Sequence, residues 1–309
     1  MKRFVLKCIV FFVINLAFVL LLYITNNNFN IYNHAITESN FLTIPQNANY
    51  DFIILGTSHA RQLSVGERQR LIEEGVGMNF MNIAGSGLGI LPEKIYLSYF
   101  FQRQNSVKDV VYVIDPFVFY SPQWNEEITF DNEPFRITLL SALVENRFST
   151  NTIMGYVGNF LRWPPFAGFD PIWDNTSTST LEKEVGLSNL KEAIDREHSA
   201  LYPDGFETSN FNKYTAHLKS IIDMSKSHGA RVIFIIPPTL WDFDPGKQTT
   251  KNLLINYQKS DGVGFYDLSG SLKNPKFYSD SSHFNTKGAV YFSTYFLKQI
   301  LTETRATKP

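Results

Sequence analysis

The sequence predicts an α/β fold, a doubly wound parallel sheet with helices on both faces. Five short apolar runs, each followed by turn signals or a helical pattern, support this prediction, at residues 52–55, 78–84, 110–114, 232–236 and 263–268. Such runs between helices are typical of parallel strands buried on both faces. With 309 residues, 44% of them hydrophobic and 15% aromatic, the chain can hold one sizeable domain plus an appendage.

Residues 1–25 are predicted to be a transmembrane signal anchor. Lys2, Arg3 and Lys7 precede an almost uncharged apolar stretch at 8–24, which as a helix nearly spans a bilayer core of roughly 30 Å. Basic residues before the span, and none just after it, favour a cytoplasmic N-terminus and a single-pass protein of the cell membrane with its domain outside the cytoplasm. A cleaved signal peptide is the alternative, although no small-residue cleavage pattern follows the apolar run.

Residues 26–49, rich in Asn, Thr and Ser, are expected to form a stalk that lifts the domain at 50–305 off the membrane. Cys8 is the only cysteine, so the exported part has no disulfide, and thiol chemistry and cysteine-based metal binding are excluded for it. The near balance of 28 Lys and Arg with 29 Asp and Glu gives no electrostatic footprint for nucleic acid.

Helices are expected between the strands. Residues 64–74 place Arg68 with other charged side chains on a polar face, residues 211–228 carry apolar residues at helical spacing, and residues 289–301 close the chain.

One stretch, at 117–207, is far longer than a crossover needs. It holds Trp124, Trp163 and Trp173, three of the four tryptophans, among many phenylalanines. Such an insertion is either a cap over the active edge of the sheet, a surface that faces membrane or a partner, or a satellite core under long loops.

A serine, a histidine and an aspartate follow predicted turns. Ser58 comes after the first strand, where Gly56 permits a tight turn into a helix. Asp280 and His283 are three residues apart, so the carboxylate can orient the imidazole that deprotonates Ser58. The glycine-rich turn at 82–87 offers backbone amides to a developing oxyanion.

These segments resemble the blocks of the SGNH, or GDSL-like, hydrolase superfamily: Gly56-Thr57-Ser58, the turn at 82–87, and the D-x-x-H element of Asp280 and His283. The resemblance implies a flavodoxin-like three-layer α/β/α sandwich with a five-stranded parallel sheet. It also implies that Ser58 is the nucleophile, His283 the general base and Asp280 its orienting partner. The amides of Ser58 and Gly87 would be the oxyanion donors, with no metal or organic cofactor.

The third block of the family departs from its pattern. The family usually carries G-x-N-D after the third strand, and its asparagine contributes to the oxyanion hole. Here the run Tyr112-Val-Ile-Asp115-Pro116 has no such asparagine. Either the amides suffice, or a side chain from the insertion substitutes, or the activity is weak.

The anchor and the sequence segments GTSHA and IDPF resemble those of a membrane-anchored subgroup, which includes the D-alanyl-lipoteichoic acid protein and alginate O-acetylation proteins. That resemblance implies acyl transfer onto envelope polymers, often beside a membrane-bound O-acyltransferase.

Four further residues are candidates for substrate binding: His59, Asn82, Asp115 and Trp241. Asp115 stands where a parallel strand should end, the edge at which open α/β sheets place their sites, although a cap or turn role is the alternative. The other histidines, 34, 198, 217 and 228, have no ligand-like spacing and are expected on the surface. Asn285 is expected to hold the histidine loop by hydrogen bonds.

The sequence therefore predicts a serine-dependent acyl-ester hydrolase or O-acyltransferase of the cell envelope, acting on acetyl-like groups of an exported polysaccharide. Two alternatives stand beside it. One is a noncatalytic scaffold that binds an envelope polymer or a membrane O-acyltransferase. The other is an esterase of small esters or lipids.

Overall fold

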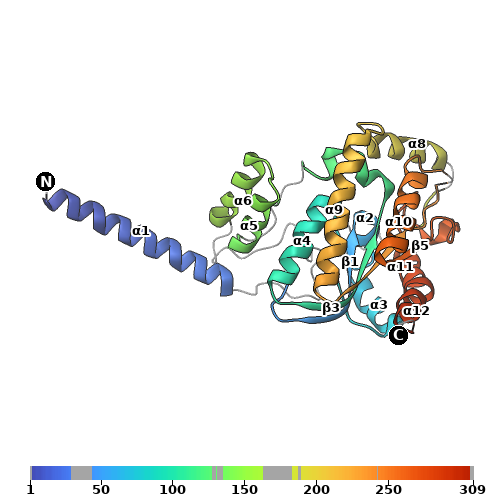
Figure 1. Cartoon of the computed structure of the whole chain (residues 1–309), viewed down its shortest axis with the longest axis horizontal. Helices are drawn as coiled ribbons and strands as arrows, with labels where there is room; N and C mark the ends of the chain where they lie inside the picture. Colours follow the sequence, from blue (N-terminus) through green and yellow to red (C-terminus); the bar gives the residue numbers. More distant parts are fainter. Residues whose placement is uncertain are drawn as a thin grey trace.

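The computed structural model describes residues 2–28, 44–126, 130, 135–162, 183–186, 189–241 and 243–306 (Figure 1). Its centre is a parallel sheet of five strands in the order β2-β1-β3-β4-β5. The strands are β1 (Asn49–Gly56), β2 (Phe80–Asn82), β3 (Ser106–Val113), β4 (Arg231–Ile236) and β5 (Gly264–Asp267). All five predicted strands are confirmed, and the run at 78–84 shortens to three residues because β2 lies at the edge of the sheet.

This strand order is that of a flavodoxin-like sheet, so the predicted α/β/α architecture is confirmed. The central strands read as continuous apolar runs because side chains on both of their faces are buried. Gly56, the last residue of β1, pairs with Val113, the last residue of β3. The segments that follow these strands, with Ser58 and Asp115, therefore emerge side by side at one edge.

Two helical layers cover the sheet (Figure 1). The larger core cluster includes residues of α4 (Ile90–Gln102) and α9 (Thr208–Ser227), with α10 (Lys247–Asp261) contributing Leu254. The second cluster joins α3 (Arg68–Val76) to the C-terminal helices, which are α11 (Thr286–Phe292), a π-helical turn at Ser293–Leu297, and α12 (Lys298–Ala306). The expected helices at 64–74, 211–228 and 289–301 correspond to α3, α9 and this C-terminal series.

The expectation for Arg68 is wrong. Its side chain is 1% exposed instead of lying on a polar face. The guanidinium donates to Gln62 O at 2.9 Å, Phe284 O at 3.3 Å and Thr286 Oγ1 at 3.1 Å. A distant segment supplies two of these acceptors, so helical spacing alone could not place Arg68 inside. The contact ties α3 to the chain just after His283.

The described helices of the insertion lie in two different parts of the domain. Helices α5 (Ile137–Glu145) and α6 (Thr150–Arg162) extend the larger core cluster beside α4, with Phe130, Phe148 and Tyr156 buried. These aromatic residues therefore belong to the larger core cluster. Helix α8 (Leu190–Leu201) instead lies near the loop that carries His283, to which its Glu197 side chain is bonded. Trp163 and Trp173 lie outside the described residues.

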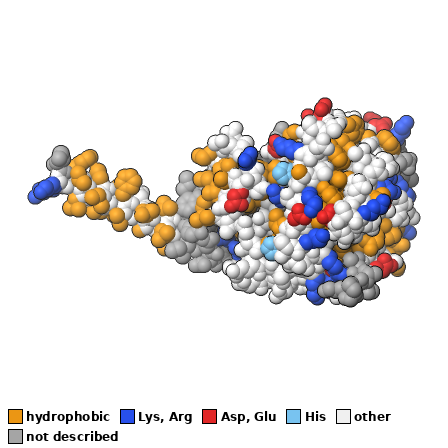
Figure 2. Space-filling model, in the orientation of Figure 1, with side chains coloured by type: hydrophobic (Ala, Val, Ile, Leu, Met, Phe, Trp, Pro, Cys, Tyr) orange, Lys and Arg blue, Asp and Glu red, His pale blue; other side chains and the backbone are white. Residues whose placement is uncertain are grey.

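Helix α1 (Lys2–Asn28) is long and apolar enough to cross a membrane, with a mean hydropathy of 2.7 over Lys2–Leu21. Figure 2 shows hydrophobic side chains along it, and mixed positive and negative charges on the visible face of the domain. An N-terminal signal sequence has the same length and composition, so the helix agrees with both expected alternatives. Most of the expected stalk, residues 29–43, lies outside the described residues. Pro45 accepts hydrogen bonds from Arg103 and Asn105 of the domain.

Gly56 is expected to tolerate no side chain. Its φ is +140°, and a Cβ there would lie 2.4 Å from Val113 O and 2.8 Å from Ala60 Cβ. Gly56→Ala should lower the free energy of unfolding by more than about 2 kcal/mol. Gly270→Ala is the control, since no atom lies within 4 Å of a Cβ at Gly270. Urea unfolding of both variants measures the difference, and equal midpoints would contradict the expectation.

Candidate active site

Ser58 is presented by a sharp turn at the end of β1. Thr57 caps the short helix α2 (Ser58–Arg61), its hydroxyl accepting from the His59 N–H at 3.3 Å. Ser58 is the first residue of this helix and is half-buried. The hydroxyl therefore lies at the C-terminal edge of the sheet, as the sequence predicts.

The three residues of the expected triad are brought together. Ser58 Oγ lies 2.7 Å from His283 Nε2, although 225 residues separate them. His283 Nδ1 lies 3.0 Å from each oxygen of the Asp280 carboxylate. With the proton on Nδ1, His283 donates to Asp280 and leaves Nε2 to accept from the Ser58 hydroxyl.

Asp280 is held in its ionised form. Burial alone would raise its pKa, but hydrogen bonding and charge attraction from His283, with the N–H groups of Ser282 and His283, hold the pKa well below its ordinary value. Those amides donate to Asp280 Oδ1 at 2.9 and 2.7 Å. The side chain is nonetheless 54% exposed, so water screens part of its charge.

The loop around His283 is fixed from both ends. The Asn285 side chain donates to Lys276 O at 2.8 Å and accepts from Gly288 N–H at 2.9 Å, which confirms its expected role. Ser279 N–H donates to His283 O at 2.9 Å. Because Arg68 also binds Phe284 O, the imidazole is positioned by backbone contacts on either side.

Asp115 joins the two neighbours of Ser58 in what we call the Thr57–Asp115–His59 clamp. One carboxylate oxygen accepts from Thr57 Oγ1 at 2.5 Å and the other lies 2.7 Å from His59 Nδ1. His59 is 6% exposed and Asp115 is 2% exposed. Burial would lower the pKa of His59, but Asp115, with smaller contributions from Glu197 and Asp280, raises it to about 9. His59 is thus a buried cation at neutral pH, which disfavours a role as a second base.

Glu197 is a site residue that sequence reasoning missed. It projects from α8, and its carboxylate accepts from Ser282 Oγ at 2.6 Å and from Ser281 Oγ. Ser282 Oγ in turn lies 3.3 Å from His283 Nδ1. The insertion therefore supports the loop between Asp280 and His283. No spacing rule links position 197 to 281, so no sequence signal could have found the contact.

His59, Glu197 and His283 are close enough to raise the question of a metal. Their ligand atoms lie within 4.8 Å of one another. Each group is already engaged, however: His283 with Ser58 and Asp280, His59 with Asp115, and Glu197 with two serines. A metal would have to displace these contacts and bind beside a protonated His59. The three groups therefore fit the Ser58–His283–Asp280 hydrogen-bonded series better than a metal site.

The backbone amides of Ser58 and Gly87 remain the proposed oxyanion donors. Within the described residues, the N–H groups of Ser58 and Gly87 donate to no protein acceptor. Gly87 has a φ of +69°, and a Cβ there would lie 3.3 Å from the Trp124 ring. Asn125 of the insertion does not replace the missing third-block asparagine, because its amide binds Leu91 N–H, Val118 O and Ser121 O.

Two other expected binding residues are inside the protein. Asn82 is fully buried, its side chain donating to Ala60 O at 2.9 Å and accepting from Ala84 N–H at 3.0 Å. Its amide therefore holds the turns around Ser58 and is not presented to a substrate. Trp241 is 5% exposed and packs edge-on against His59 and His198, with ring centroids 5.9 and 4.7 Å apart. His198 is half-buried there, contrary to its expected surface position.

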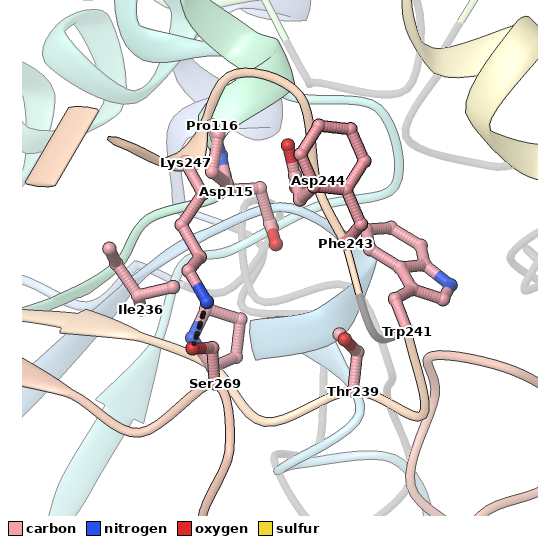
Figure 3. Close-up of a pocket in the computed structure, with 10 residues that line it drawn as sticks. Asp115, Pro116, Ile236, Thr239, Trp241, Phe243, Asp244, Lys247 and Ser269 are labelled. Carbon is pink, nitrogen blue, oxygen red and sulfur yellow. Dashed lines mark hydrogen bonds between the residues drawn. The ribbon is translucent and has the colours of Figure 1, made fainter. Parts of the chain in front are cut away.

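A cavity of about 20 Å³ lies beside Asp115 at the carboxyl ends of the strands (Figure 3). Thr239 and Trp241 lie on one side, while Asp115 lies on the other beside Lys247, which donates to Ser269 Oγ at 2.8 Å. This volume is enough for about one water molecule or a methyl group.

Glu93 lies beneath the turn that presents Ser58. It is fully buried on α4, and one carboxyl oxygen accepts from Gly56 N–H at 3.1 Å. Burial raises its pKa well above the ordinary value, which favours the uncharged acid. Sequence reasoning missed Glu93 because it did not predict helix α4, on which this residue lies.

Together these groups can activate a hydroxyl. His283 can take the proton of Ser58, Asp280 can stabilise the resulting imidazolium, and the amides of Ser58 and Gly87 are free for a developing oxyanion.

Comparison with known proteins finds similar solved structures but no match by sequence. No family model matches this chain. No curated protein matches its sequence. One solved structure, described as an acylhydrolase from Bacteroides fragilis, is 11% identical with a TM-score of 0.43, over 85% of this chain and 92% of that chain. A GDSL-like lipase from Bacteroides thetaiotaomicron is 11% identical with a TM-score of 0.42, over 84% of this chain and 89% of that chain. Neither likeness assigns a reaction to this chain.

Proposed function

We propose that this protein is a serine-dependent acyl-ester hydrolase or O-acyltransferase. The observation that carries the proposal is the continuous hydrogen-bonded series from Ser58 Oγ through His283 to Asp280. Ser58 attacks the ester carbonyl, forming a bond to carbon, while His283 accepts its proton. His283 then gives that proton to the departing alcohol, leaving an acyl-enzyme on Ser58.

Hydrolysis and transfer share this acyl-enzyme, because either water or a second hydroxyl can attack it. The N-terminal helix supports a place at the membrane, with the domain outside the cytoplasm, where acetyl-like groups of an exported polysaccharide are the proposed substrate. A membrane-bound O-acyltransferase is the proposed partner for transfer. This finer assignment rests on the resemblance of the GTSHA and IDPF segments to the membrane-anchored subgroup.

Covalent labelling of the full-length protein in detergent by a fluorophosphonate tests the proposal. The wild type should be labelled and Ser58→Ala should not, because the probe traps an activated serine. Ser227→Ala is the matched control, since Ser227 is exposed at the end of α9 and outside the candidate site. A wild type that stays unlabelled, or equal labelling of Ser58→Ala, would contradict the proposal.

One observation favours a noncatalytic scaffold as the second candidate. The side chain of Asn125 is committed to backbone groups, so its amide does not complete the oxyanion hole. If Ser58→Ala fully supports polymer acylation in cells, the scaffold is favoured over the enzyme.

A further inference from the structure

A groove lies between α8 and the loop that carries the catalytic base. Its volume is about 680 Å³ and it is open to solvent. Asn189, Ala193 and Arg196 line one side, and Ser279, Ser281 and His283 line the other. The insertion therefore contributes lining residues to a cleft that reaches the candidate triad.

In the proposed reaction, the alcohol part of the ester must lie beside His283. The base returns its proton to the departing alcohol and takes one from any incoming hydroxyl, so the alcohol must approach the imidazole. His283 and Asp280 are both in the wall of the groove. The cavity beside Asp115, at about 20 Å³, is too small for more than a methyl group.

The groove is lined by groups that recognise hydroxyls. It offers an amide, two serine hydroxyls and a guanidinium, and Lys183 stands at its edge. The carboxylates of Asp280 and Glu197 are satisfied by His283 and the neighbouring serines. A lipid chain would bury the Asn189 amide and the Arg196 guanidinium without bonding to them, whereas a sugar can bond to both. The hydroxyls of Ser279 and Ser281 donate to His283 O and Glu197, and their oxygens can still accept from a sugar hydroxyl. The groove volume of about 680 Å³ lies within the range of about 300–1,000 Å³ that is typical of ligand-binding pockets.

We propose that this groove binds the alcohol part of the ester, a hydroxyl-rich saccharide segment, and that α8 is its recognition wall. The inference rests on the proposed function and adds the location and the determinants of substrate choice. Glu197 connects the groove to the catalytic base, because the helix that carries it lines the groove and its carboxylate binds Ser281 and Ser282 beside His283.

Filling the groove tests this assignment. Ala193 lines it, whereas Ala200, seven positions along the same helix, is exposed and does not. Full-length wild type, Ala193→Trp and Ala200→Trp would be compared in detergent on 4-nitrophenyl acetate, an O-acetylated xylo-oligosaccharide and a diacylglycerol. Ala193→Trp should lower kcat/KM for the oligosaccharide at least about tenfold more than it lowers kcat/KM for 4-nitrophenyl acetate, whose alcohol is much smaller. Ala200→Trp should match the wild type.

Arg196→Gln is a second variant that leaves the helix intact. It should raise KM for the oligosaccharide with kcat unchanged, as expected for a lost binding contact. The inference is overturned if both groove variants act equally on the oligosaccharide and on 4-nitrophenyl acetate, or if the wild type prefers the diacylglycerol. A wild type that neither turns over 4-nitrophenyl acetate nor reacts with a fluorophosphonate overturns the proposed function, and this inference with it.

Discussion

Replacing His283 with alanine is expected to lower kcat for ester turnover by about 10⁴- to 10⁶-fold. The Ser58 hydroxyl is a poor nucleophile at neutral pH, and His283 Nε2, at 2.7 Å, is the base in contact with it. The loss should appear in kcat with 4-nitrophenyl acetate and leave thermal unfolding nearly unchanged, because His283 is partly exposed.

His228→Ala is the control for that experiment, since His228 is exposed at the end of α9 and bonds to Met224 O. It should retain the wild-type kcat. A His283→Ala variant that keeps more than about one-tenth of the activity would mean that another group accepts the proton. His59 is the nearest alternative, with its ring 4.7 Å from that of His283. Its Nδ1 faces Asp115 and its raised pKa keeps it protonated, so we expect no such rescue.

The sheet and the triad could be predicted because both depend on local sequence. Each strand is a short apolar run, and the residues that follow parallel strands gather at one edge. Helix α4 was not predicted, since ten of its thirteen residues are buried and no amphipathic stripe marks it. Glu197 was missed for another reason: its partners lie 84 and 85 residues away.

The Thr57–Asp115–His59 clamp was predicted only in part. Sequence reasoning placed Asp115 at the active edge and His59 beside Ser58, but joining them required the adjacency of β1 and β3 in the sheet. Strand order is set by packing over the whole domain, and one run of residues does not encode it. The oxyanion hole could not be judged from the sequence for the same reason, because only the fold shows that the Asn125 side chain is bonded to the backbone of Leu91 and Val118.

Removing the charge of Asp115 is expected to give the largest loss of stability. Asp115→Asn keeps the shape of the side chain but leaves the His59 imidazole buried without its counter-charge. Breaking a buried pair in this way costs about 3–5 kcal/mol. The surface pair of Lys219 and Asp223 provides the control, because Asp223→Asn should change stability by less than about 1 kcal/mol.

The pH dependence identifies the cause of that loss. The pKa of His59 is about 9 in the folded protein against an ordinary value of 6.5, so its contribution is fully present below pH 6.5 and is lost as pH rises through about 9. The unfolding midpoints of wild type and Asp115→Asn should therefore differ most at pH 6 and converge above pH 9. In the His59→Gln background, the change in unfolding midpoint that Asp115→Asn adds should no longer depend on pH in this way, because His59, the group whose pKa is raised, is absent from both variants. A gap between wild type and Asp115→Asn that stays constant from pH 6 to pH 10 would show that Asp115 acts through its shape and hydrogen bonds and not through the charge of His59.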